Sequence, residues 1–104
     1  CRHVILCHMV ELPKPEPLAA PDARKLIQEI VKNGAVGFSA HAEKEMAKDD
    51  LQTTDCLNVM RGGIVGPGEL IDGTWRYRIS TPHMCVVVAF PSATKLRVVT
   101  VWRK

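Results

Sequence analysis

The hydrophobic pattern of the chain changes its period at Gly62-Gly63, and this change limits the folds that the chain can adopt. Before this point, apolar residues recur at roughly every third or fourth position, the spacing that gives an α-helix one buried face. After it, apolar residues alternate with polar ones and are often β-branched or aromatic, as in half-buried strands. A helical half followed by a strand half predicts an α+β domain.

Boundary signals divide the first half into three expected helices. The first has Pro21 in its first turn and ends at Asn33-Gly34. The second contains His41–Met46, and the third ends at the Gly62-Gly63 terminator. The expected starts are Asp22, an N-cap at Ser39, and an N-cap at Thr53 or Thr54.

The second half is expected to form strands near 64–71, 74–80, 84–90 and 95–103. Asp72-Gly73 is a two-residue turn signal, Thr81-Pro82 begins another turn, and Pro91–Thr94 is a polar loop. The sequence therefore predicts two or three helices packed on one face of a four-stranded, mainly antiparallel sheet. The other face of that sheet would be free for function.

Residues 1–17 are expected to form an N-terminal arm, and residues 18–104 a single domain. Prolines interrupt regular structure here, and the dipeptide His8-Met9 resembles a cloning junction, so part of the arm is a candidate for vector sequence. No apolar run approaches the ~20 residues of a membrane span, and no secretion leader opens the sequence. We therefore expect a cytoplasmic protein without a membrane partner.

The sequence predicts neither a metal nor a cofactor. The spacing of Cys1, His3, Cys7 and His8 fits no common zinc site. Cys56 and Cys85 lie in apolar patterns that are typical of buried free thiols. No glycine-rich phosphate loop, serine nucleophile motif or paired-histidine metalloprotease motif is found.

Positive charge is concentrated in the strand half of the chain. Residues 1–57 contain 7 Lys or Arg and 9 Asp or Glu, whereas residues 58–104 contain 7 Lys or Arg and 2 Asp or Glu. This asymmetry favours an anionic partner. The alternative is that basic side chains protect exposed strand edges.

Strand alternation suggests which basic side chains share a face. In the 74–80 strand, Arg76 and Arg78 should lie opposite Tyr77. In the last strand, Arg97 and Arg103 should share one face, with Thr100 and Trp102 on the other as packing residues. Arginines that share a face can bind phosphates, or they can simply be solvated surface residues.

His41 opens the second helix directly after a short apolar segment, Ala35–Phe38. A positioned imidazole can transfer protons near neutral pH. The competing interpretation is a packing or capping residue at a helix start.

Several segments resemble a small bacterial family of domains of unknown function. The stretch containing His41-Ala42 and Met46 is similar to its "His-Ala-x-x-Arg-Met" helix, and the later Thr54-Asp55 and Val59–Gly63 follow in matching order. Three strands are similar to its "Tyr-Arg-Val", "Val-Val-Val-Ala-Tyr/Phe" and "Val-Val-Thr-Val-Tyr/Trp" segments: Trp75–Ile79, Cys85–Phe90 and Leu96–Trp102. The resemblance covers roughly residues 36–103, and it departs from the pattern at Glu45, where the family has Arg.

The resemblance implies a fold near the MqsR and RelE type toxins, which are α+β ribonucleases silenced by an antitoxin. It implies as partners RNA and an antitoxin of the zinc-finger or helix-turn-helix type. Such a fold does not fix the function, and at Glu45 this chain lacks the cation that the family pattern has near His41.

Our first hypothesis is a metal-independent endoribonuclease toxin in which RNA crosses the open sheet face. His41 would move a proton, and Arg76 and Arg78 would stabilise charge on the phosphate as ribose 2′-oxygen attacks it. The RNA backbone would be held by Lys95, Arg97, Arg103 and Lys104. The second hypothesis is a non-catalytic protein-interaction module, and the third is a plain nucleic-acid-binding domain.

Overall fold

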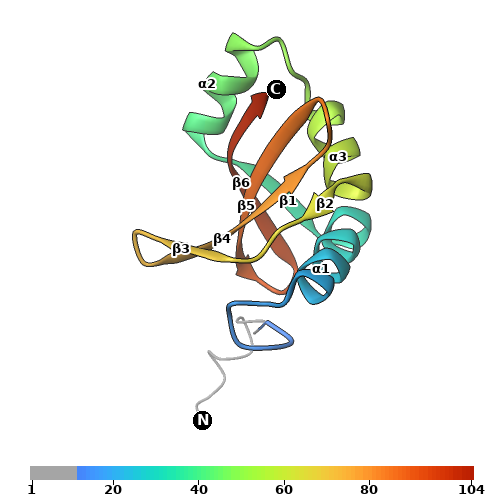
Figure 1. The fold of residues 1–104 in the computed structure, drawn as a ribbon, viewed down its shortest axis with the longest axis vertical. Coiled ribbons are helices and arrows are strands. Elements are labelled where there is room, and N and C mark those ends of the chain that lie inside the picture. Colours follow the sequence, from blue (N-terminus) through green and yellow to red (C-terminus); the bar gives the residue numbers. More distant parts are fainter. Residues whose placement is uncertain (1–11) are drawn as a thin grey trace.

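The computed structural model describes residues 12–104, in which helices pack on a twisted sheet (Figure 1). Three helices lie in the first part of the chain: α1 (Ala20–Asn33), α2 (Ala40–Lys48) and α3 (Thr53–Gly62). Six strands form the sheet: β1 (Ala35–Phe38), β2 (Ile64–Val65), β3 (Glu69–Ile71), β4 (Thr74–Ser80), β5 (Met84–Ser92) and β6 (Lys95–Arg103). The predicted α+β class is confirmed.

The sheet is larger than the expected four strands. Its order is β1-β6-β5-β4-β2, and β3 pairs with an outer part of β4. β1 runs parallel to β6, while the other pairings are antiparallel. The expected 64–71 strand is two short strands, because the intervening residues are Gly66-Pro67-Gly68. β1 was not expected because four residues between two helices give too short a pattern to assign.

The expected turn at Asp72-Gly73 is confirmed. Asp72 has φ 52° and Gly73 has φ 79°. Two consecutive positive φ values are typical of the two-residue turns whose twist matches a hairpin. The turn joins β3 to β4 and extends this hairpin beyond the body of the sheet (Figure 1).

The helix boundaries follow the sequence signals in two cases out of three. Ser39 caps α2, since its hydroxyl accepts a hydrogen bond from the Ala42 amide at 3.0 Å. The first helix begins at Ala20, so Pro21 lies in its first turn as expected. The N-cap of α3 is Gln52 rather than a threonine, because the Gln52 amide donates to Asp55 Oδ2 at 2.8 Å.

Of the two or three helices expected on one face of the sheet, two lie there. α1 and α3 cover one face of the sheet, whereas α2 lies against β6 near the end of the chain (Figure 1). β1 pairs only with residues 95–98 of β6, and α2 follows where β1 ends. The hydrophobic core between sheet and helices includes Ile27, Ile30, Val59, Met60, Tyr77, Ile79, Val86, Val88, Leu96, Val98 and Val101.

A β-bulge in β6 changes which of its side chains share a face. Val88 pairs with Val98, but the preceding residue, Val87, pairs with Thr100. Val99 is therefore an extra residue without a partner on β5, and the alternation shifts by one beyond it. Arg97, Thr100 and Trp102 consequently lie on the face away from the core, while Arg103 does not share that face. The expected grouping of Arg97 with Arg103, and of Thr100 and Trp102 opposite them, is wrong for this reason.

Residues 12–19, the described part of the chain before α1, contain no helix or strand but are fixed to the core by Tyr77. The buried Tyr77 hydroxyl accepts a hydrogen bond from the Leu18 amide at 2.9 Å and donates one to Glu16 Oε2 at 2.9 Å. Gly68 lies close against this ring, since a Cβ there would come within 2.9 Å of Tyr77. Of the expected arm at residues 1–17, residues 1–11 lie outside the described part of the chain.

The hydroxyl of Tyr77 should contribute measurably to stability. Tyr77→Phe leaves the Leu18 amide without its partner, and we expect the free energy of unfolding at pH 7 to fall by about 1–3 kcal/mol. Urea denaturation followed by circular dichroism measures this change. A Tyr77→Phe protein as stable as the wild type would contradict the role of this hydroxyl.

The stability difference should also depend on pH. Burial raises the pKa of Tyr77 from 10.0 to about 12, with a further contribution from Glu16. Above pH 10 the unfolded chain loses the phenol proton while the folded protein keeps it, so this group's contribution declines as pH rises towards 12. The gap in unfolding free energy between wild type and Tyr77→Phe should therefore narrow from pH 10 to pH 12.

Candidate anion-binding face of the sheet

The face of the sheet away from α1 and α3 carries arginines above small apolar residues. We call this surface the open face. Its central row on β5 consists of Cys85, Val87 and Ala89, which are buried although they lie outside the core beneath the helices. Longer side chains from the two neighbouring strands cover them: Arg76 and Arg78 from β4, and Arg97, Thr100 and Trp102 from β6.

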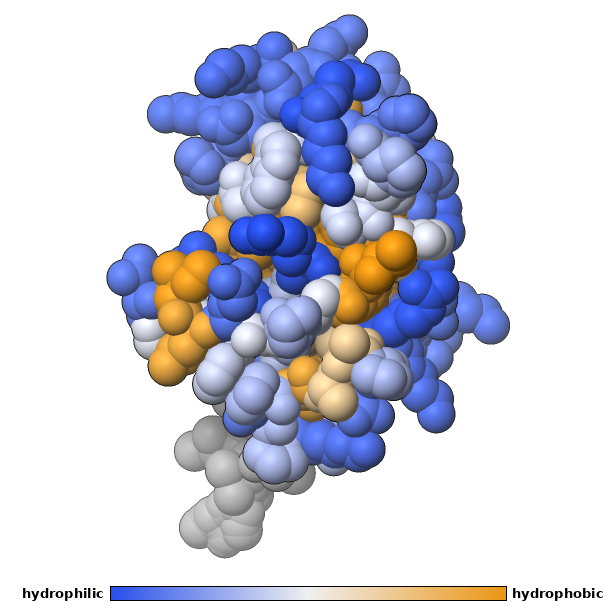
Figure 2. Space-filling view, in the orientation of Figure 1, coloured by the Kyte–Doolittle hydropathy of each residue, from blue (hydrophilic) through white to orange (hydrophobic). Residues whose placement is uncertain are grey.

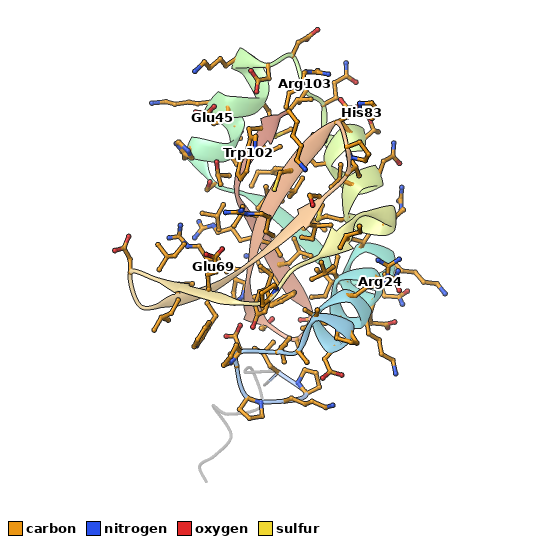
Figure 3. All side chains as sticks on the ribbon, in the orientation of Figure 1. Arg24, Glu45, Glu69, His83, Trp102 and Arg103 are labelled. Carbon is orange, nitrogen blue, oxygen red and sulfur yellow. The ribbon has the colours of Figure 1, made fainter. Side chains whose placement is uncertain are left out.

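Figure 3 shows the two sides of the sheet. Trp102 on β6 and Glu69 on β3 lie on the side opposite α1, and Arg24 extends from α1 on the other side. The open face is therefore bounded by α2 and by the β3–β4 hairpin (Figures 1 and 3).

A hollow of about 260 Å³ lies at one end of the open face. Arg97 pairs with Ala89 across β5 and β6, and Arg76 lies on the other side of that alanine. The hollow is lined by Ser39, Thr74, Arg76, Ala89, Phe90, Pro91, Arg97 and Val99. Two guanidinium groups from different strands thus border one small cavity.

The bulge in β6 brings the start of α2 to this hollow. Because Val99 is out of register, its carbonyl is free to accept a hydrogen bond from the Ser39 hydroxyl at 2.8 Å. The Ser39 amide donates to the neighbouring Val98 carbonyl at 2.9 Å. The same Ser39 hydroxyl caps α2, so the positive end of this helix begins at the edge of the hollow.

A second group of side chains lies further along the open face. The Arg78 guanidinium lies over the Trp102 ring at 5.5 Å from its centroid, a cation–π contact. Glu69 Oε1 lies 3.8 Å from Arg78 Nη2, but both side chains are more than half exposed. An exposed pair at this distance contributes little, so Arg78 remains available to another anion.

Cys85 lies beneath this second group. Burial raises the pKa of its thiol, and the positive charges of Arg78 and Lys104 partly oppose the rise. Cys85 pairs with Trp102 across β5 and β6, so the indole and the thiol are neighbours on the open face. The sequence prediction of a buried free thiol is confirmed for Cys85 and for Cys56.

The structure brings together some of the residues that the sequence singled out. Arg76, Arg78 and Arg97 share the open face, and Lys95 lies at its border, beside Gly37. Arg103 lies elsewhere: its guanidinium donates to the Asp49 carbonyl at 3.0 Å, and its amide lies 3.3 Å from Asp49 Oδ2.

The remaining candidate residues do not line the hollow. Lys104 is exposed at the end of the described chain, and its amide donates to the His83 carbonyl at 2.8 Å. His41 is exposed in the first turn of α2, two residues after Ser39. Glu45 is partly buried one turn later on the same side of α2.

Sequence reasoning missed Ser39 and Trp102 as members of the site. Ser39 has a capping signal, and nothing in the sequence shows that its hydroxyl also contacts β6. Trp102 was expected to be a packing residue because strict alternation puts it opposite Arg97. Trp102 is five residues after Arg97, so strict alternation puts the two side chains on opposite faces. The extra residue at Val99 shifts the alternation by one and puts them on the same face.

Apolar side chains are also exposed near the site. Figure 2 shows hydrophobic surface over the β3–β4 hairpin and over β2, with hydrophilic side chains between these two areas. The exposed residues are Ile64 at 76%, Leu70 at 57% and Ile71 at 40%. They lie on short outer strands of the sheet.

The position of Cys85 gives a test of the open-face geometry. Trp102→Ala should let water reach the thiol and lower its pKa towards the ordinary value, which increases the thiolate fraction about tenfold for each unit of pKa. Iodoacetamide labelling resolved by peptide mass spectrometry should show faster modification of Cys85. Cys56, whose pKa burial raises to about 11, is the internal control, and equal acceleration at both thiols would mean general loosening instead.

Comparisons with known proteins add no relatives. No family model matches the sequence, and neither a curated protein nor a solved structure matches it significantly. Within residues 12–104, no cluster of three His, Cys, Asp or Glu side chains is placed to hold a metal ion. No helix of the described part has the length and apolar character of a membrane span.

Proposed function

We propose that this chain is a ribonuclease of the toxin type and that single-stranded RNA crosses the open face of its sheet. The observation that carries the proposal is the convergence of Arg76, Arg78 and Arg97 on one face. The described residues offer these three guanidinium groups one carboxylate within ion-pair distance, Glu69. Arginines arranged in this way favour phosphate oxygens, which accept two parallel hydrogen bonds from one guanidinium.

An extended RNA strand fits this surface better than a small anion does. The arginines are distributed along the face from the hollow to Trp102, so they can contact successive phosphates. Trp102 is partly exposed and already carries a cation over its ring, which makes it a candidate for stacking on an unpaired base. Duplex RNA would keep its bases paired and unavailable to such a platform.

In the proposed reaction, His41 accepts the proton of a ribose 2′-hydroxyl. The 2′-oxygen then bonds to the adjacent phosphorus, and the bond from phosphorus to the 5′-oxygen of the next nucleotide breaks. The leaving 5′-oxygen takes up a proton from water, and the protonated His41 returns its proton to the solvent. The products are a 2′,3′-cyclic phosphate and a 5′-hydroxyl. Arg76 and Arg78 stabilise the negative charge that develops on the phosphate oxygens. The sequence supplies no metal-ligand motif, so the proposed reaction is metal-independent.

The proposal includes a toxin-antitoxin role in the cytoplasm with a RelE/MqsR-like arrangement, as the sequence resemblance implies. An acidic antitoxin segment that covers the open face would compete directly with RNA. The partner would be a zinc-finger or helix-turn-helix protein. Growth arrest on expression, relieved by the protein encoded in the neighbouring gene, tests this role.

A second candidate function is a non-catalytic protein-interaction module. The exposed Ile64, Leu70 and Ile71 favour it, because apolar residues on outer strands suit contact with another protein. In that case binding would depend on these three residues and would be insensitive to salt. The two functions are therefore separated by the experiments that follow.

RNA binding should weaken steeply as salt increases. If three arginines each neutralise one phosphate, the logarithm of affinity should fall with the logarithm of salt at a slope of roughly 2. Arg78→Gln should reduce the slope by about 0.7. Fluorescence anisotropy with a labelled oligonucleotide measures both, and Arg61→Gln on α3 removes an equal charge from the helix side as a control. A slope unaffected by Arg78→Gln would place the RNA elsewhere.

His41→Ala should lower RNA cleavage by about 10²–10⁴-fold while leaving RNA affinity nearly unchanged. His83→Ala, at an exposed turn, is the matched control and should leave cleavage intact. Cleavage should persist in a chelator and leave a 2′,3′-cyclic phosphate, detectable by end-group analysis. Full activity of His41→Ala, or loss of wild-type activity with chelator, would contradict the mechanism. If the wild type bound RNA but did not cleave it, the chain would be an RNA-binding domain and not a ribonuclease.

A further inference from the structure

The hollow beside α2 differs from the rest of the open face because its two arginines point at one small space. Arg76 and Arg97 come from β4 and β6, with the small Ala89 of β5 between them. The methyl group of Ala89 leaves room between the two guanidinium groups. The resulting cavity, about 260 Å³, is smaller than typical pockets for whole organic ligands.

One donor in this region has no partner. Arg76 Nε is buried and makes no hydrogen bond within the described residues. An unpaired buried donor on a charged group costs free energy, so the Arg76 side chain would gain from any rearrangement that brings Nε to an acceptor. Neither Arg76 nor Arg97 forms an ion pair with a carboxylate of residues 12–104.

The start of α2 adds positive potential at the same place. Ser39 lines the hollow, and the first intrahelical bond is donated by Glu43 to the Ser39 carbonyl. The Ser39 hydroxyl already donates to Val99 and accepts from Ala42, so it is a fixed wall and not a free donor. Its role is to hold the helix start in position, where the helix dipole favours an anion.

We propose that this hollow binds one phosphate group of the RNA backbone, between the guanidinium groups of Arg76 and Arg97. The inference rests on the proposed function and adds a fixed position for the strand. Phosphate suits the hollow because its several oxygens can accept hydrogen bonds from two guanidinium groups on opposite sides. Arg78 and Trp102 would then contact the strand outside the hollow.

Titration with inorganic phosphate, followed by amide NMR of the whole chain, tests the hollow without RNA. The amides of Ser39, Ala40 and Arg97 should shift and saturate together. Arg76→Gln and Arg97→Gln should each weaken phosphate binding by about tenfold or more. Arg76→Lys should weaken it by less than Arg76→Gln, since it keeps the charge and loses the forked geometry. Arg61→Gln is the matched control and should leave binding unchanged.

The RNA arm uses a short oligonucleotide and the same variants, each first shown by its amide spectrum to be folded. Arg76→Gln should lower oligonucleotide affinity, and bound RNA should prevent the phosphate-induced shifts. Absence of saturable shifts at the hollow would overturn the proposal. It would also be overturned if Arg76→Gln and Arg97→Gln left oligonucleotide affinity unchanged while Arg78→Gln reduced it. If the wild type bound no RNA at all, the proposed function would fail, and so would the inference that the bound phosphate belongs to RNA. The titration with inorganic phosphate would still show whether the hollow binds an anion.

Discussion

The arrangement of the open face depends on the contact between Ser39 and the bulge in β6. One side chain makes two hydrogen bonds, donating to the Val99 carbonyl and accepting from the Ala42 amide, so the strand and the helix are fixed to each other. Without the extra residue at Val99, that carbonyl would point along the regular strand ladder and would not be free for Ser39. The same contact sets where α2 begins, and therefore where the positive end of its dipole lies relative to Arg97.

The bulge also decides the chemistry of the face, because it changes the side on which every later residue of β6 lies. Regular alternation would put Arg97 and Arg103 together and would leave Trp102 in the core. With the bulge, Trp102 lies beside Cys85 on the open face and contacts Arg78, while Arg103 extends to the end of α2 and bonds to Asp49. One inserted residue thus replaces what would be a fourth arginine of the open face, Arg103, by an aromatic ring, Trp102. A face that combines guanidinium groups with an indole can contact both the phosphates and the bases of a single strand.

Features set by local physical chemistry could be predicted from the sequence. The Asp72-Gly73 turn, the Ser39 cap and the placement of Arg76 opposite Tyr77 all depend on neighbouring residues, and all were expected. Features set by contacts between distant segments could not be predicted. β1 is a strand only because β6 pairs with it, and the bulge at Val99 has no glycine or other local signal. The Gln52 cap was missed because its partner is the Asp55 carboxylate rather than a cap hydroxyl. In the candidate site, Arg76 and Arg78 of β4 were therefore assigned correctly to one face. Ser39, which lines the hollow, and Trp102, which contacts Arg78, were not assigned to it.

The small residues beneath the arginines connect the stability of the face with its proposed binding role. Cys85, Val87 and Ala89 are buried by side chains of the adjacent strands, since no helix of the described part covers this side of the sheet. The hydrocarbon stems of the arginines can cover apolar surface while their charged groups stay in water. The same side chains that would bind an anion therefore also shield β5. Truncating one of them to alanine would remove charge and uncover the strand together, so that lost binding and lost packing could not be separated. Glutamine keeps much of the stem and removes only the charge, which is why glutamine variants isolate the electrostatic contribution of each arginine.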